Sequence, residues 1–107
     1  MAVVAEFELR VLLAVLRLPE GAYAVAVHEE IERRTRRAAS LGAVYITLDR
    51  LEGKGLLRSR LGDPTPQRGG RPKRYYQATA AGTRAARDEC QAMRRLWDGL
   101  DIVRDES

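Results

Sequence analysis

The chain has 107 residues, of which 45% are hydrophobic and 32% are charged, and its formal net charge is +4. This composition is typical of one folded domain with a single core, and it excludes a disordered chain. No apolar run approaches the roughly 18 residues that a membrane span needs. Acidic residues near the N-terminus, where a signal peptide carries basic ones, favour a cytoplasmic protein without a membrane partner.

Positive charge is concentrated in one segment. Residues 58–74 carry six basic side chains against one acidic, whereas the other 90 residues carry 13 basic and 14 acidic side chains. A basic segment on a nearly neutral body favours a surface for a polyanion. A solvated charge cluster is the commoner meaning of such a run, so composition alone leaves both alternatives open.

The first two predicted helices differ in how much of their surface is apolar. Residues 6–18 are apolar on nearly every side, which predicts a helix buried on more than one face, in the centre of the fold or at an interface. Residues 25–36 have one apolar face and an outer face of paired Glu and Arg at helical spacing, which predicts a partly exposed helix.

A third helix is predicted over residues 41–54, with Ser40 as its N-cap and Gly55 as its stop. One narrow stripe is apolar: Leu41, Val44, Leu48 and Leu51. The opposite side is small and mixed: Gly42, Ala43, Ile46, Thr47 and Arg50. A merely solvated helix more often carries Glu and Lys there, so this face is suited to close approach by another surface.

Two short strands and a last helix follow. Residues 56–61 and 73–79 flank a segment rich in glycine and proline, which predicts a β-hairpin with a long basic tip. Thr79 is expected to cap a final helix that continues to about Val103. Its apolar positions are spaced 4, 3, 4 and 3, as in a coiled-coil seam, with Leu96 beside them: Ala86, Cys90, Met93, Trp97 and Leu100.

This order of elements predicts an α+β fold, mostly α: a winged helix-turn-helix of three helices and a two-stranded wing, plus a C-terminal dimerisation helix. Residues 1–79 are the expected DNA-binding domain, and residues 80–107 the dimerisation helix and a short tail, within one structural domain. The major groove of DNA is about 12 Å wide and admits one helix, here the third. The wing then reaches phosphate or the minor groove.

Three segments resemble the PadR-type family of transcriptional regulators: residues 6–12, residues 40–56 with the third helix, and residues 69–82 with the wing. The likeness covers about residues 5–100, and the short C-terminal region is similar to the compact subtype with a single dimerisation helix. Gly53 departs from the pattern, since such helices usually carry a helix former there. The resemblance implies a homodimer that represses by occupying a pseudo-palindromic operator and is often released by a small molecule or stress signal.

Candidate DNA contacts follow from these elements. The recognition-helix candidates are Ser40, Ala43, Tyr45, Ile46, Thr47 and Arg50, and the wing candidates are Arg68, Arg71, Lys73 and Arg74. We expect Arg50 and Thr47 to contact base edges, with a phosphate contact or a surface ion pair as the alternative for Arg50. Strand alternation directs either Lys73 or Arg74 away from the DNA, so Arg68 and Arg71 are the stronger wing candidates.

The first and last helices are too apolar for one small trunk, and the resemblance assigns the dimer interface to them. The candidates for this interface, or for a ligand site within it, are Phe7, Val11, Cys90, Met93, Leu96, Trp97 and Leu100. We favour Trp97 as a packed interface residue. The alternative is a planar apolar effector held between the two Trp97 rings, with Met93 as an adaptable wall.

No arrangement of residues points to catalysis. Cys90 is the only cysteine and His28 the only histidine, so neither a disulfide framework nor a Cys-rich metal site is expected. His28 and Glu32 lie one helical turn apart, but two ligands do not make a metal site. We expect no enzyme, no metal and no cofactor. The alternative function is a winged-helix module that binds an acidic protein partner.

Overall fold

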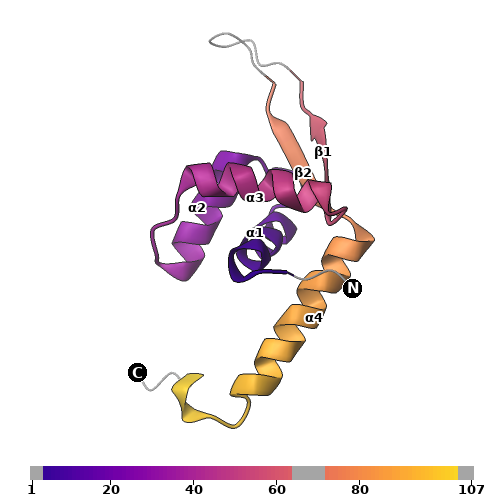
Figure 1. The fold of residues 1–107 in the computed structure, drawn as a ribbon. Coiled ribbons are helices and arrows are strands. Elements are labelled where there is room, and N and C mark those ends of the chain that lie inside the picture. The colour runs from indigo at the N-terminus through magenta and orange to yellow at the C-terminus, as the bar shows by residue number, and fades with distance from the viewer. Residues whose placement is uncertain (1–3, 64–71, 104–107) are drawn as a thin grey trace.

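A computed structural model describes residues 4–63 and 72–103 (Figure 1). The helices are α1 (Glu6–Arg17), α2 (Ala24–Thr35), α3 (Leu41–Gly53) and α4 (Ala80–Trp97), and the strands are β1 (Leu57–Leu61) and β2 (Arg74–Ala78). A short 3-10 turn, η1 (Asp101–Val103), follows α4. This mostly helical fold with one two-stranded sheet confirms the predicted fold class. The wing candidates Arg68 and Arg71 lie outside the described residues.

Helix α1 is the centre of the core. It packs against α2, α3, α4 and β2, as its nearly continuous apolar surface predicts. Val11 and Leu12 are completely buried within the chain's own trunk. The prediction that Val11 lies at a dimer interface is therefore wrong, because its side chain has no surface left for a second subunit.

The two ends of α3 form as the sequence predicts. The Ser40 hydroxyl accepts a hydrogen bond from the Ala43 backbone N–H at 3.1 Å, which caps the helix. Gly55 has a φ of +78°, in the left-handed region that a glycine tolerates, and turns the chain into β1. The short connection places the wing directly beside the end of α3.

The two strands of the wing are antiparallel, with Leu57 opposite Ala78 and Leu61 opposite Arg74. The backbone N–H of Tyr76 donates to Ala22 O at 2.8 Å, so β2 is also tied to the loop that precedes α2. Leu57 is buried at the base of the hairpin, whereas its far end rises clear of the trunk above α3 (Figure 1).

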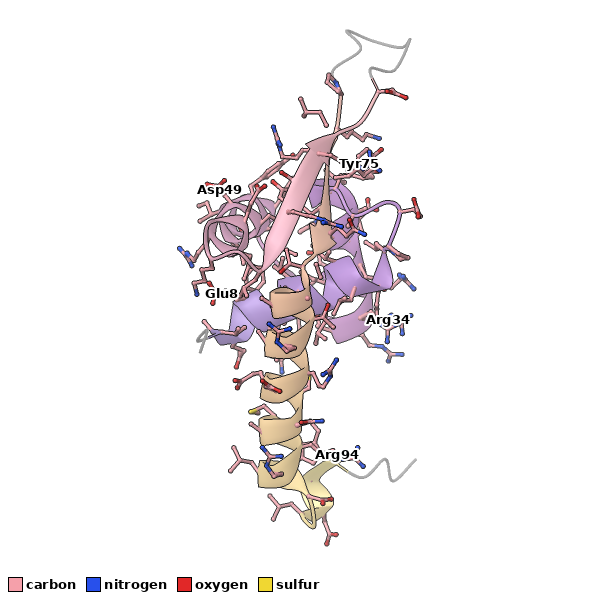
Figure 2. All side chains as sticks on the ribbon, turned by 90° about the vertical axis from the view of Figure 1, so that its right-hand side faces the viewer. Glu8, Arg34, Asp49, Tyr75 and Arg94 are labelled. Carbon is pink, nitrogen blue, oxygen red and sulfur yellow. The ribbon has the colours of Figure 1, made fainter. Side chains whose placement is uncertain are left out.

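Helix α4 starts against the trunk and then leaves it. The Thr79 hydroxyl accepts from Gly82 N at 3.0 Å, which confirms the predicted cap. The helix ends at Trp97, not near Val103, because Asp98 is extended and Gly99 has a φ of +86°. Figure 2 shows α4 standing clear of the other helices, with Arg94 near its far end. In the described part of the chain, no helix is long and apolar enough to cross a membrane.

Gly82 is the place where α4 touches the turn before β1. A Cβ atom at this position would lie 2.0 Å from the carbonyl oxygen of Leu56, which is far inside contact distance. We expect Gly82→Ala to lower the free energy of unfolding by about 2 kcal/mol or more, because backbone must move. Urea denaturation followed by circular dichroism measures this.

Gly53→Ala is the matched control, since a Cβ at Gly53 has nothing within 4 Å. Alanine should leave the stability unchanged or raise it by up to about 1 kcal/mol, because it favours helix over the unfolded chain. Equal effects of the two substitutions would contradict the close approach at Gly82.

Candidate nucleic-acid interface

The exposed face of α3 carries large side chains that nothing in the trunk covers. Ile46 is 61% exposed, Tyr45 and Arg50 are also exposed, and Ala43 is half-buried. Tyr45, which the sequence placed beside the buried stripe, points mainly to solvent. Exposed Ile and Tyr on one helical face indicate a surface that is covered when the protein works.

Thr47 does not belong to this face. It is only 5% exposed, so the prediction that it lies on the outer side and contacts a base is wrong. Val44, Thr47, Leu48 and Leu51 are at positions i, i+3, i+4 and i+7, which form a buried stripe wider than the narrow one expected. Leu41, expected to be buried, is exposed at the first turn instead.

The Arg50 side chain is exposed and, within the described residues, forms no hydrogen bond or ion pair, although its charge helps to lower the pKa of Glu8. The surface ion pair that was one alternative for Arg50, with Glu52 or Asp49, is not formed, and the Glu52 carboxylate instead accepts from the Ser59 hydroxyl at 2.7 Å. The Arg50 guanidinium therefore stands on the exposed face of α3 without a bonded partner that would hold it back.

An ion pair between a buried carboxylate and a partly exposed lysine helps to hold α3 on the core. Glu8 of α1 is only 3% exposed, and the Lys54 ammonium donates to its two carboxylate oxygens at 2.9 and 2.8 Å. The Ala5 backbone N–H donates to the same carboxylate at 2.8 Å. Burial raises the pKa of Glu8, but the hydrogen bonds from Lys54 and Ala5 outweigh it, so the pKa lies below its ordinary value of 4.5.

The turn between α2 and α3 is held by two side chains of α2. His28 Nε2 lies 2.7 Å from the Ala39 carbonyl oxygen, and the Ala39 N–H donates to Glu32 at 2.9 Å. Sequence reasoning assigned His28 and Glu32 no role beyond an incomplete metal-ligand pair. In the structure they hold the turn that leads into the N-terminal end of α3. The turn geometry depends on both groups of one backbone residue being bonded.

One face of the wing is joined to α3. The Arg74 guanidinium donates to the Ser59 hydroxyl at 3.0 Å, and that hydroxyl donates to Glu52 of α3. Tyr76 follows on the same face, where its burial, with Glu52 nearby, raises the pKa of its phenol. Arg74 therefore lies on the side of the wing that continues the exposed surface of α3.

The other face of the wing carries stacked cations and rings. The Lys73 ammonium lies 4.3 Å from the centre of the Tyr23 ring, and the Arg60 guanidinium lies 5.1 Å from that of Tyr75. The two rings meet edge to face at 5.7 Å. Figure 2 shows Tyr75 on one side of the strands and Asp49 of α3 on the other. Lys73 and Arg74 thus point to opposite faces, as strand alternation predicts.

Sequence reasoning missed two residues that help to position this interface, Glu8 and Lys54, which form the ion pair. It counted Arg58 and Arg60 of β1 as charge only. These exposed cations lie on the Tyr75 face of the wing, opposite to Arg74. A signal for Glu8 exists, since residues 8, 11, 12 and 15 follow the spacing of one helical face, and a carboxylate there must find a cation. Strand alternation alone would have placed Arg58 and Arg60 together on one face of the wing.

The apolar seam of α4 is uncovered in the single chain. Met93, Trp97 and Leu100 are exposed, and Leu96 is 74% exposed. Cys90 is half-buried, and Phe7 of α1 packs against the core with part of its surface free. Leu100 lies beyond the end of the helix, so the regular seam ends at Trp97.

A helix-turn-helix whose second helix is exposed beside a basic two-stranded wing defines the winged-helix class of DNA-binding proteins. The model of the PadR-like family of transcriptional regulators matches residues 12–88. The chain therefore belongs to this family, whose members are DNA-binding transcriptional regulators rather than enzymes.

Solved structures agree with this assignment. A PadR family transcriptional regulator from Eggerthella lenta is 28% identical, with 94% of this chain and 89% of that chain covered and a TM-score of 0.66. A transcriptional regulator from Clostridium thermocellum (20% identity, 91% and 92% covered, TM-score 0.69) shares the fold. So does a PadR-like transcription factor from Bacteroides fragilis (22% identity, 90% and 89% covered, TM-score 0.64). A search of curated proteins finds no significant match.

The ion pair between Glu8 and Lys54 is expected to stabilise the fold. Lys54→Met keeps the aliphatic stem but leaves the buried carboxylate with one donor fewer, so it should cost about 1–3 kcal/mol at neutral pH. The partial exposure of Lys54 keeps the effect at the lower end. Chemical denaturation of Lys54→Met, Glu8→Gln and the double variant measures the coupling.

The same variants test the pH dependence. Because the pKa of Glu8 is lowered by folding, its contribution is present above pH 4.5 and is lost as the pH falls through the native value. Glu8→Gln should therefore lose less stability than the wild type between about pH 6 and pH 3. Strictly additive single effects, or identical acid limbs, would show that the pair is not coupled.

Proposed function

We propose that the chain is a sequence-specific repressor that binds a pseudo-palindromic operator as a homodimer and is released by a small apolar molecule. Helix α3 enters the major groove, the wing contacts the neighbouring backbone, and α4 joins the two subunits. The proposal takes its class from the PadR-like family match and its residue roles from the exposed surfaces of this chain.

One observation carries the DNA-binding part of the proposal. The exposed face of α3 and the Arg74 face of the wing lie on the same side and are joined through Ser59 and Glu52. Arg50 faces outward without a bonded partner among the described residues, so its five N–H donors are available to guanine O6 and N7. In the proposed complex, the exposed Ile46 meets a thymine methyl group and the exposed Tyr45 meets a phosphate.

The remaining candidates take supporting roles. Ser40 and Ala43, at the N-terminal end of α3, allow the helix backbone to approach the DNA closely. Arg68 and Arg71, in the segment between the described residues of the wing, contact phosphate together with Arg74. Lys73 packs on Tyr23 and stiffens the wing from its other side.

The dimer part of the proposal is supported by the uncovered end of α4. The trunk does not cover the apolar surface formed by Met93, Leu96 and Trp97. Exposure of this surface to water is unfavourable, so a partner that buries it stabilises the protein. A two-fold axis pairs this surface with itself and repeats α3 for a second half-site. Cys90 and Phe7, both half-buried, lie at the edge of the paired surface.

Release follows from the same surface. A planar apolar compound that stacks between the two Trp97 rings would change how the α4 helices cross and hence the distance between the two α3 helices. A ligand that fits only one distance between the two α3 helices shifts the dimer population toward that distance. Ligand binding is thereby coupled to release of the operator. Repression needs nothing beyond occupancy of the operator.

Substitutions in α3 and the wing should separate base reading from phosphate binding. Arg50→Ala should reduce the preference for the operator over scrambled duplex by about 1–3 kcal/mol, because it removes a contact to a base edge. Arg74→Ala should weaken both duplexes alike and lower the salt slope by about one. Fluorescence anisotropy titrations over a salt series, with DNA selected from the chain's own upstream region, measure both.

Two results would count against these roles. Identical effects of Arg50→Ala and Arg74→Ala would remove the division between the two residues. Equal affinity of the wild type for operator and scrambled DNA at moderate salt would contradict sequence-specific binding. Capture of an acidic protein partner that survives nuclease treatment would then favour the protein-interaction alternative.

The effector site predicts a fluorescence signal, because Trp97 is the only tryptophan. Planar apolar compounds should quench Trp97 emission and release the operator over the same concentration range. Leu61→Ala, an exposed apolar change on the wing, is the control and should leave quenching unchanged. A chemically diverse panel that neither quenches nor releases would show that Trp97 is packed and not a ligand site.

A further inference from the structure

A second apolar surface lies away from α4, in a groove between α1 and α2. Its floor is formed by Ala14 and Ile31, and the partly exposed Leu13 forms one wall. The hollow has a volume of about 190 Å³. Since an apolar cavity of about 150 Å³ holds a benzene molecule, this groove has room for a branched aliphatic side chain.

The rim of the groove is basic. Arg10, Arg17 and Arg34 border it, and of these Arg10 pairs with Glu6 at 3.2 Å. The one acidic residue that lines the groove, Glu30, is buried and accepts hydrogen bonds from Arg33 and Arg34. These bonds, that of Arg34 foremost, hold the pKa of Glu30 below its ordinary value, so its charge is already balanced. Arg17 has no ion-pair partner among the residues the structure describes.

The segment that follows α4 has the complementary chemistry. From Asp98 to Ile102 it alternates acidic and apolar residues around Gly99, and Ile102 is 80% exposed. Leu100 is also exposed. A short segment with two carboxylates and two uncovered aliphatic side chains fits an aliphatic hollow bordered by arginines.

The direction of α4 decides which groove this segment can reach. Its first turns pack against α1, and the rest runs away from the trunk (Figures 1 and 2). If two α4 helices pair in antiparallel fashion about a two-fold axis, the far end of each lies beside the start of the other. That start is packed on the α1 of its own subunit, and α1 also forms one wall of the groove.

We propose that residues 98–102 of each subunit dock into the α1–α2 groove of a second copy of this chain. Ile102 enters the hollow beside Leu13 and Ile31, and the carboxylates of Asp98 and Asp101 lie against the basic rim. The inference rests on the homodimer of the proposed function and extends its interface beyond the α4 seam to a surface on the DNA-binding domain. The docked segment would therefore tie the crossing of α4 to the position of the trunk.

Charge reversal on either side should weaken the dimer. Arg17→Glu in the groove, or Asp98→Lys with Asp101→Lys in the segment, should each raise the dimer dissociation constant by about tenfold or more, since symmetry repeats every contact. Arg37→Glu is the matched control, an exposed reversal on the turn after α2, and should leave the constant unchanged. Sedimentation velocity over a dilution series measures the constants, and thermal melting by circular dichroism shows whether each variant is folded.

Mixing the two reversed proteins shows whether docking is between subunits. In a mixed dimer, the groove that carries Arg17→Glu in one subunit meets the segment that carries the two lysine substitutions in the other, and the remaining site is unchanged. The mixed dimer should therefore outnumber both homodimers well beyond the statistical ratio in native mass spectrometry. A segment docked in its own groove gives no such preference, which would overturn the proposal.

The remaining outcomes are separable from failure of the proposed function. A wild type that stays monomeric at every concentration would overturn the dimer and this inference together. A stable wild-type dimer that neither reversal weakens would overturn only the inference. Weakening by Arg17→Glu without weakening by the segment variant would assign the groove to another part of the partner and would also overturn it.

Discussion

The packing of three helices and one strand against α1 is the constraint on which the rest of the structure depends. Because α1 is covered by α2, α3, α4 and β2 of its own chain, its apolar surface is used within the trunk. The buried Glu8 then requires a cation, and Lys54 supplies it from the end of α3. This ion pair, together with the buried Val44, Leu48 and Leu51, holds α3 on the core and leaves its opposite face exposed.

Two uncovered surfaces follow from that arrangement, and they differ in chemistry. The α3 face continues onto the Arg74 side of the wing through the bonded Ser59 and Glu52, and it is polar enough to meet a phosphate backbone. The far half of α4 is apolar and has no trunk to pack against. The proposed function uses both surfaces, one for the operator and one for a partner subunit, and the far half of α4 lies at the end of the molecule away from the wing (Figure 1).

Local chemistry made much of this predictable from the sequence. Ser40, Gly55 and Thr79 act on the backbone next to them, so the ends of α3 and the start of α4 follow from residue type. The prediction for Thr47 failed because the width of the buried stripe on α3 depends on how closely α1 and β1 approach that helix. The periodicity of the sequence carries no information on this distance. Val11 was misassigned for a related reason, since an apolar surface does not say which partner covers it. The predicted end of α4 was wrong because Gly99 has a positive φ, which ends the helix before Val103.

A hydroxyl-radical footprint on the upstream DNA tests most directly whether two copies of this chain read two half-sites through α3. We expect two symmetric protected patches with centres about one helical turn, or 34–36 Å, apart, or a multiple of it, lost together as salt is raised. A single protected patch bound by one subunit, or uniform protection along the duplex, would contradict it.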